Sequence, residues 1–561
     1  MNKFKEIVVV TALVAISAVP RFVGLGDFTS IDEPFWLRQS GNFYYALGQR
    51  EFQNTLYEYH PAVTTMWIIT GGMLAYFPEY RALGQGYLKP GKFDEFMLQH
   101  GKSLLELLTV SRGIQVLLIL VLLVAMYALL RALFDRRSAF FATAFVSLAP
   151  FLMGQSRLLN HEAMVGLFSM VSLLGILAYA YRGQRFGALL ISGVAAGLAQ
   201  LTKSSAMPII LLVPLVLVTH ALTAKGQARG TLLARALGVL GLWLAILAGT
   251  YILVWPGMWV APLAMLQDVY GNAFSYALQG VRTSVAPGLD AHGIDAASIV
   301  GGIGIYINDL IWRTTPVTVL GVLAAIALGM RRARNDDDGI FRWLALYAFL
   351  LAAAFVLLFG IQRGPKPPHY ILTSYVALDV VAGLALVRAW TWLARRFPAI
   401  DTRTGTALAL GIILVIQLSS ALRAFPYYIS YYNPVVEALQ PGVQNPTLND
   451  NGYGVGLDQA AAYLAAKPRA QNLVVLSAHG LGSFSYYFPG RTVAMNNFSM
   501  SDPEVAAIVP DTDYIVVDYY NHERKHVDQD LTRVQPEKSI WINGIEFLRI
   551  YPSSEFLSAA P

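Results

Sequence analysis

Eleven apolar runs, each close to the length of a bilayer span, are spread over the first three quarters of the chain. They lie near 6–26, 111–133, 138–154, 162–181, 187–201, 204–222, 237–256, 314–330, 343–360, 370–388 and 406–424. Apolar runs of this length are typical of transmembrane helices. The sequence therefore predicts a polytopic α-helical membrane protein with about 11 transmembrane helices. The first run resembles a signal peptide, but no small-residue cleavage site precedes Arg21, so we interpret it as a retained span.

The composition excludes the ordinary soluble classes. Of the 561 residues, 55% are hydrophobic and 14% are charged, whereas soluble domains carry about 25% charged residues. A disordered chain, a nucleic-acid binder of ordinary design and a single soluble enzyme are therefore excluded, and no nucleic-acid partner is expected. The absence of cysteine also excludes disulfides, thiol catalysis and thiolate metal sites.

Charge divides the chain near residue 425. From Pro426 onward there are 8 Lys+Arg and 14 Asp+Glu, whereas the preceding part has 33 and 21. We expect a transmembrane domain over 1–425 and an acidic soluble domain over 426–561.

Basic residues gather in alternate loops between the apolar runs. With the N-terminus inside, the internal loops hold 18 Lys+Arg and only six Asp+Glu, as the positive-inside rule requires. This predicts a multi-pass plasma-membrane protein with a cytoplasmic N-terminus and an external C-terminal domain. Two long loops, 27–110 and 257–313, are then external. Within these loops, we expect an amphipathic helix at the membrane interface over 61–77, and another over 260–278.

The tail predicts a small α/β domain. A short helix over Asp458–Leu464, capped by Asp458, stops before Pro468. Buried strands are expected at 472–477 and 514–519. A hairpin joins 540–542 to 545–550 through an Asn-Gly turn.

Two adjacent carboxylates follow the first apolar run. Asp32 and Glu33 lie in the sequence Ser-Ile-Asp-Glu-Pro-Phe-Trp that begins at Ser30. At a membrane interface, partial burial and mutual repulsion raise carboxyl pKa values and suit general-base chemistry. The alternative is structural, because Ser30 and Glu33 also form a capping box for a helix over 34–48.

Two further polar groups lie next to apolar runs on the external side. His60 precedes Pro61 at the start of the 61–77 helix, where it could bind an anionic or hydroxylic ligand or serve as a cap. Arg157, His161 and Glu162 lie in a short turn between two apolar runs. For Arg157 and Glu162, a purely structural ion pair is the alternative to a site.

Basic residues on the external side are unexpected under the positive-inside rule, so their presence there indicates a function. Lys203 lies at the outer end of one run, and Arg363, Lys366, His369 and Tyr370 precede another. Binding of a phosphate or diphosphate headgroup would be such a function. Solvated loop ends are the alternative.

Five motifs follow one another along residues 1–425: Asp32-Glu33, His60-Pro61, Ser-Arg157 with an acidic residue five positions on, Gly-Leu-Ala-Gln-Leu-Thr-Lys203, and His369-Tyr370. Together they resemble the membrane glycosyltransferases of the GT-C class, in particular the protein O-mannosyltransferase and aminoarabinose-transferase branch. The sequence departs from that pattern at Glu162, where the family usually has aspartate, and at His369-Tyr370, where it usually has Arg-Tyr.

The resemblance implies inverting transfer of a sugar from a polyprenyl phosphate to an acceptor on the non-cytoplasmic side. The acceptor could be a protein, a lipid or a glycan. By position, Asp32 is the general base, Glu33 orients the acceptor, and Arg157 contacts the donor phosphate with help from Lys203. The expected catalytic residues are Asp32, Glu33 and Glu162, and the expected substrate-binding residues are His60, Arg157, His161, Lys203, Arg363, Lys366, His369 and Tyr370.

No metal is strictly needed, because the leaving group is already a phosphate, although Asp32, Glu33, His60 and Glu162 could bind a divalent cation. A transporter or flippase of a lipid-linked or anionic substrate is the main alternative function. An assembly protein whose tail binds envelope partners is another. Convergence of Asp32, Arg157 and Glu162 on one external cavity would favour the transferase, and a pathway at the membrane midplane would favour transport.

Overall fold

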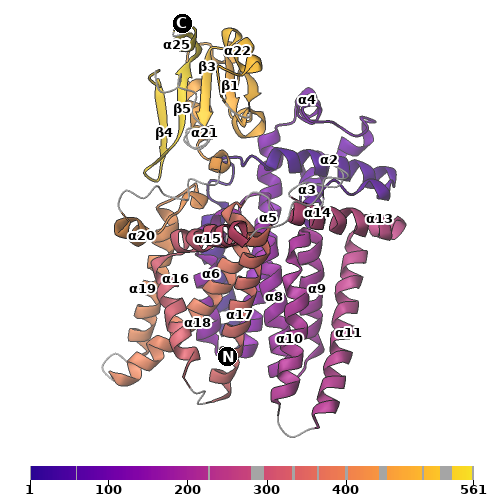
Figure 1. The fold of residues 1–561 in the computed structure, drawn as a ribbon, viewed down its shortest axis with the longest axis vertical. Coiled ribbons are helices and arrows are strands. Elements are labelled where there is room, and N and C mark those ends of the chain that lie inside the picture. The colour runs from indigo at the N-terminus through magenta and orange to yellow at the C-terminus, as the bar shows by residue number, and fades with distance from the viewer. Residues whose placement is uncertain are drawn as a thin grey trace.

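The apolar runs form helices that stand roughly side by side, with a sheet-containing domain beyond one end of the bundle (Figure 1). The structure, a computed structural model, describes residues 2–58, 60–224, 228–279, 296–331, 335–362, 366–397, 402–440, 451–495, 498–518 and 534–558. Within these ranges, seven helical segments are long and apolar enough to cross a membrane. They are α5 (Leu104–Leu133), α8 (Glu162–Tyr181), Ser204–Thr223, which includes α10 (Pro208–Thr223), α11 (Arg229–Val254), α17 (Asp336–Ile361), Pro368–Arg396, which includes α18 (Leu372–Arg396), and α19 (Arg403–Leu422).

The remaining predicted spans are also helical, but the structure does not confirm the count of eleven. They are α1 (Asn2–Phe22), α6 (Arg136–Ser147) with α7 (Pro150–Gln155), α9 (Phe186–Thr202) and α16 (Pro316–Gly329). A 113° bend separates α15 (Ala296–Arg313) from α16, and counting this bent pair as one span gives up to eight in the described residues. Proline explains two of these interruptions: it favours the first turn of a new helix and cannot continue an old one, and both α7 and α16 begin with it.

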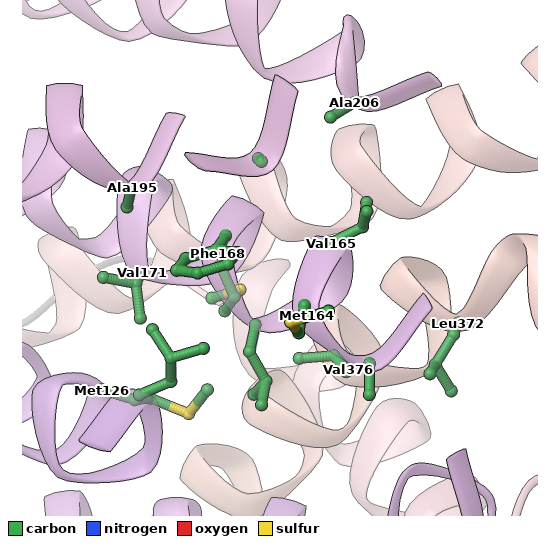
Figure 2. Close-up of a cluster of buried hydrophobic side chains, with 14 of the residues drawn as sticks. Met126, Met164, Val165, Phe168, Val171, Ala195, Ala206, Leu372 and Val376 are labelled. Atoms are coloured by element: carbon green, nitrogen blue, oxygen red, sulfur yellow. The ribbon is translucent and has the colours of Figure 1, made fainter. Parts of the chain in front are cut away.

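Helix α8 lies at the centre of the bundle. In its most apolar stretch, 94% of the residues are buried. Its apolar side chains belong to a buried cluster with residues of neighbouring helices, and Figure 2 labels Met126, Met164, Val165, Phe168, Val171, Ala195, Ala206, Leu372 and Val376 of that cluster. A helix that is apolar on all sides belongs in a protein core or in lipid, and here it is the core. The N-terminal end of α8 is therefore held rigidly.

Short helices cross the end of the bundle that faces the sheet domain (Figure 1). They are α2 (Glu33–Gln49), α3 (Val63–Tyr76), α4 (Lys92–Gln99), α12 (Gly257–Val260), α13 (Pro262–Leu266) and α14 (Asn272–Gln279). The prediction of an amphipathic helix over 61–77 is wrong in one respect. Helix α3 packs against α2, α5 and α9 and is buried along most of its length. Gly72 permits this, since a Cβ there would come within 2.1 Å of the Ser111 hydroxyl.

The tail folds around one five-stranded sheet of order β2-β1-β3-β5-β4. Its strands are β1 (Val474–Ala478), β2 (Arg491–Met495), β3 (Tyr514–Asp518), β4 (Lys538–Ile542) and β5 (Ile545–Pro552), and its helices are α20 (Pro434–Leu439), α21 (Leu457–Ala465), α22 (Pro503–Ile508) and α25 (Ser553–Ser558). Strands β2, β1 and β3 are parallel, and β5 joins them antiparallel.

The predicted β4–β5 hairpin is confirmed, with Asn543 and Gly544 at positive φ in its turn. Strand β2 was not predicted, because it lies at the sheet edge and is mostly exposed, so it has no apolar run. The predicted cap at Asp458 is wrong. Helix α21 begins one residue earlier behind Gly456, and Asp458 instead accepts a hydrogen bond from the Tyr427 hydroxyl (2.7 Å).

The sheet domain packs directly on the start of the first long loop. Phe28 and Leu158 share one apolar cluster with Tyr453, Val475 and other tail residues. The Tyr487 hydroxyl donates to the Gly26 carbonyl oxygen (2.9 Å). This contact brings the tail next to the residues that precede α2.

Candidate functional site

Asp32 lies immediately before α2, at the end of the bundle covered by the tail. Its side chain is half-buried, and its Oδ2 accepts a hydrogen bond from the Tyr453 hydroxyl (3.0 Å). Tyr453 is buried and adopts a positive φ of 48° beside Gly454. The tail therefore supplies one of the contacts of the predicted base, and the sequence carried no signal for it.

Glu33 is fully buried and has a structural set of partners. Its carboxylate accepts two hydrogen bonds from the Arg112 guanidinium (2.7 and 2.6 Å), one from the Leu159 amide (2.8 Å) and two from Ser30. The bond from the Ser30 amide is half of a capping box, but the Ser30 hydroxyl donates to Glu33, and the residue at the N-cap of α2 is Asp32. Both carboxylate oxygens of Glu33 are thus engaged inside the protein, next to the backbone of Asp32.

Glu162 pairs with Lys203, not with Arg157. The Lys203 ammonium lies 2.5 Å from Glu162 Oε1, and both side chains are almost entirely buried. These residues lie at the first turn of α8 and just past the end of α9. The ion pair therefore links the start of α8 to the end of α9. A buried ion pair of this kind is stable only with good geometry.

His161 and His60 lie beside this ion pair. Thr65 Oγ1 is 2.9 Å from His161 Nδ1, and the Trp36 ring meets the His161 ring edge-on at 4.3 Å. The His60 ring centroid lies 6.0 Å from that of His161. The two predicted histidines thus come together, although they are a hundred residues apart in the chain.

The predicted loop before α18 completes the group. The Lys203 ammonium lies 3.9 Å from the centre of the Tyr370 ring, a cation–π contact. The centroid of the His369 ring lies 5.1 Å from that of the Tyr370 ring and 5.0 Å from that of the Tyr453 ring. A continuous series of contacts therefore runs from Asp32 through Tyr453, His369 and Tyr370 to Lys203.

Two of the predicted residues, Arg157 and Lys366, lie outside this group. Arg157 donates to the carbonyl oxygens of Val23 (2.8 Å) and Gly24, and its guanidinium lies over the Tyr428 ring. Lys366 donates to three carbonyl oxygens at the C-terminal end of α17. Arg363 lies outside the described residues.

The predicted cation ligands do not form a metal site. Among the described residues, no three His, Asp or Glu side chains lie close enough together to hold a metal ion. Two of the four predicted ligands are paired with basic side chains of the protein: Glu33 with Arg112, and Glu162 with Lys203.

Replacement of Arg157 by alanine is expected to lower thermal stability. The variant loses the donors to Val23 and Gly24, and hydrogen bonds to a charged group contribute about 1.5–3 kcal/mol. Arg157→Lys should restore little, because one ammonium cannot reproduce the guanidinium fork. Melting curves with and without a polyprenyl phosphate separate the roles. An unchanged melting temperature with weakened ligand binding would support the donor-phosphate role of Arg157.

His161 should make stability fall at mildly acidic pH. Burial, together with the Lys203 charge, lowers the pKa of His161 to about 3, compared with about 6.5 in an unfolded chain. Below pH 6.5 the unfolded state therefore binds a proton that the folded state does not. Stability should fall with decreasing pH, by at most about 1.4 kcal/mol per unit. Melting curves between pH 7.5 and 5 should show this slope, and His161→Gln should reduce it; equal slopes would contradict the assignment.

A sequence model of the dolichyl-phosphate-mannose-protein mannosyltransferase family matches residues 104–255. The match begins with α5 and ends at Trp255, and so contains the Glu162–Lys203 pair. No curated protein matches the chain.

Solved structures show similarity at low identity. ArnT from Cupriavidus metallidurans bound to undecaprenyl phosphate has 15% identity and a TM-score of 0.47, over 98% of this chain and 99% of that chain. An archaeal oligosaccharyltransferase, AglB from Archaeoglobus fulgidus in complex with an inhibitory peptide and a dolichol-phosphate, has 13% identity and a TM-score of 0.41, over 92% of this chain and 70% of that chain.

The chain is thus a multi-pass membrane protein with a C-terminal sheet domain, and it resembles the GT-C glycosyltransferases as its motifs predict. The family matched within that class is the dolichyl-phosphate-mannose-protein mannosyltransferases.

Proposed function

We propose that this protein transfers a sugar from a polyprenyl-phosphate donor to an acceptor hydroxyl on the non-cytoplasmic face of the membrane. The observation that carries the proposal is the contact series that links the half-buried Asp32 to Lys203. A base and a cation linked by a series of aromatic and imidazole groups suit a reaction with a proton to remove and a phosphate to release.

In the proposed reaction, Asp32 accepts the proton of the acceptor hydroxyl as its oxygen bonds to the anomeric carbon. The bond from that carbon to the phosphate oxygen breaks on the opposite face, so the configuration inverts. The electron pair leaves with the polyprenyl phosphate. The Tyr453 hydroxyl, which donates to Asp32, orients the carboxylate toward its substrate.

Lys203 is the proposed cation for the leaving phosphate. Its contacts with Glu162 and Tyr370 fix its position, so charge that develops on the phosphate meets a cation already in place. His369 and Tyr370 lie beside it and are the proposed neighbours of the phosphate or the sugar. Lys366 and Arg157 remain proposed donor contacts, and Arg363, which lies outside the described residues, is proposed with them.

His60 and His161 are the proposed contacts for sugar hydroxyls. His161 is neutral at physiological pH, and its Nε2 has no hydrogen-bond partner within the described part of the chain. A buried nitrogen without a hydrogen-bond partner destabilises the protein. A hydroxyl of the donor sugar would supply that partner.

The test is transfer by the purified full-length protein. We would incubate it with a panel of hexosyl and pentosyl polyprenyl phosphates and with peptide, lipid and glycan acceptors, and identify the products by mass spectrometry. Appearance of a glycosylated acceptor with release of polyprenyl phosphate supports the proposal. In sealed proteoliposomes, movement of the donor between leaflets without any covalent product would instead establish the transporter alternative.

The proposed face of the membrane predicts a labelling pattern. A tag appended at the C-terminus should be reachable from outside intact cells, and a tag inserted in 331–340 should not, because alternate loops are basic. Protection of the C-terminal tag would reverse the orientation and place the reaction on the cytoplasmic face.

A further inference from the structure

A large basic cavity lies at the opposite end of the bundle from Asp32. Its volume is about 1070 Å³, and it is lined by the start of α6, by Arg331 and Asn335, by the start of α17 and by the end of α18. Six arginines line it: Arg137, Arg331, Arg342, Arg388, Arg395 and Arg396. Tyr370 and Arg388 are 18 residues apart along η5 (Pro368–Ile371) and α18, roughly 27 Å at 1.5 Å per residue. The cavity is therefore separate from the proposed donor site.

Aromatic rings hold two of these arginines in place. The Arg388 guanidinium lies between the Phe134 ring (4.7 Å) and the Phe341 ring (4.4 Å). The Arg331 guanidinium lies 5.3 Å from the Trp392 ring. Stacking covers the flat face of a guanidinium and leaves its N–H edges for an anion, so the cavity is prepared for a ligand with phosphate oxygens.

In the described part of the chain, two carboxylates share the lining, Asp135 and Asp338, and Asp337 also acts on the Arg388 charge from nearby. Asp135 caps α6: its carboxylate accepts from the Arg137 amide (2.9 Å), the Ser138 amide (3.2 Å) and the Ser138 hydroxyl (2.6 Å). These three aspartates do not balance six arginines, and the cavity keeps a positive field.

An apolar groove adjoins this cavity and shares Arg342 with it. The groove has a volume of about 650 Å³ and runs between α16 and α17, past Ile326, Met330, Leu346 and Phe349. Among the described residues that line the groove, Arg342 is the one that is charged. Ile326, Met330 and Leu346 are also exposed on the outside of the protein, where these spans would meet lipid.

We infer that this cavity and groove together form a binding site for an anionic phospholipid. The phosphate occupies the arginine cavity, with Arg342 at the junction, and an acyl chain lies in the groove between α16 and α17. A free phosphate would use only the cavity, so the attached groove favours a lipid. Basic pockets between spans on the cytoplasmic side are the usual place for such headgroups, and the positive-inside rule predicts that this end is cytoplasmic.

The test measures lipid retention by the full-length protein in detergent. Native mass spectrometry and thermal shifts would compare phosphatidylglycerol, cardiolipin, phosphatidylcholine and inorganic phosphate. We expect retention and stabilisation by the two anionic lipids only. Equal stabilisation by inorganic phosphate would show an anion site without a lipid, and equal retention of phosphatidylcholine would show that the arginines do not select the headgroup; either result overturns the inference.

Matched variants localise the effect. Arg342→Gln with Arg395→Gln should weaken anionic-lipid binding about thirtyfold, the factor expected for two charges near a phosphate. Arg229→Gln with Arg235→Gln removes the same charge from exposed positions on α11, outside the cavity, and should change binding little. Equal losses in the two variants would overturn the site.

A glycine in the groove tests the acyl chain separately. A Cβ on Gly329 would meet nothing within 4 Å, so Gly329→Trp can fill the groove without disturbing the helix. This variant should retain less long-chain phosphatidylglycerol yet bind its short-chain, soluble analogue as the parent does. Unchanged retention of the long-chain lipid would remove the groove from the site.

Discussion

Replacement of Asp32 by asparagine should lower turnover about 10²–10⁴-fold, the usual contribution of a general base. The substitution is nearly isosteric, and the amide oxygen can still accept the hydrogen bond from Tyr453. Folding and donor binding should therefore persist, and only proton removal is lost. Turnover by mass spectrometry and donor binding by thermal shift would be measured on the same preparations.

Tyr453→Phe is the matched control for this variant. It removes the hydroxyl that orients Asp32 but keeps the carboxylate and the ring next to His369. We expect a smaller loss of turnover than in Asp32→Asn, together with a shifted pH profile. If Asp32→Asn keeps parental turnover whereas Glu162→Gln abolishes it, Asp32 is not the base, and the Glu162–Lys203 pair becomes the centre of the reaction.

Replacement of Arg112 by alanine should give the largest loss of stability, about 3–5 kcal/mol. Glu33 would be left as a buried charge without its cation, and removal of one partner of a buried ion pair has this cost. Arg112 and Glu33 are 2% and 0% exposed, so water cannot replace the lost partner. The melting temperature of the purified variant measures the effect, and activity should fall with it, because Glu33 fixes the backbone beside Asp32.

The pair between Glu6 and Arg136 is the control for this effect. Its side chains are about one third exposed, and exposed pairs contribute at most about 1 kcal/mol. Double-mutant cycles with glutamine at both positions of each pair would compare the two coupling energies. A coupling between Glu33 and Arg112 no larger than that between Glu6 and Arg136 would contradict the structural role of Glu33.

Local sequence signals predicted much of the fold. The positions of the spans follow from apolar length, and the helix expected over 34–48 occurs as α2, over Glu33–Gln49. The β4–β5 turn follows from the positive φ that Asn543-Gly544 tolerates. The number of membrane crossings could not be predicted from apolar length. Pro150 and Pro316 each begin a new helix, and hydropathy alone does not show where one helix ends and the next begins.

The sequence by itself determined the apolar spans, the basic loops and the polar residues grouped at the ends of the spans. Only the tertiary structure decided which of those polar residues meet. Tyr453 is 421 positions from Asp32, and Arg112 is 79 positions from Glu33; no periodicity connects such residues. Arg157 is another example. The residues around it in the sequence do not indicate that it donates to the carbonyl oxygens of Val23 and Gly24. The physical reason is that apolar periodicity reports which face of a helix is buried, whereas the partner of a buried charge is set by how the helices pack against one another.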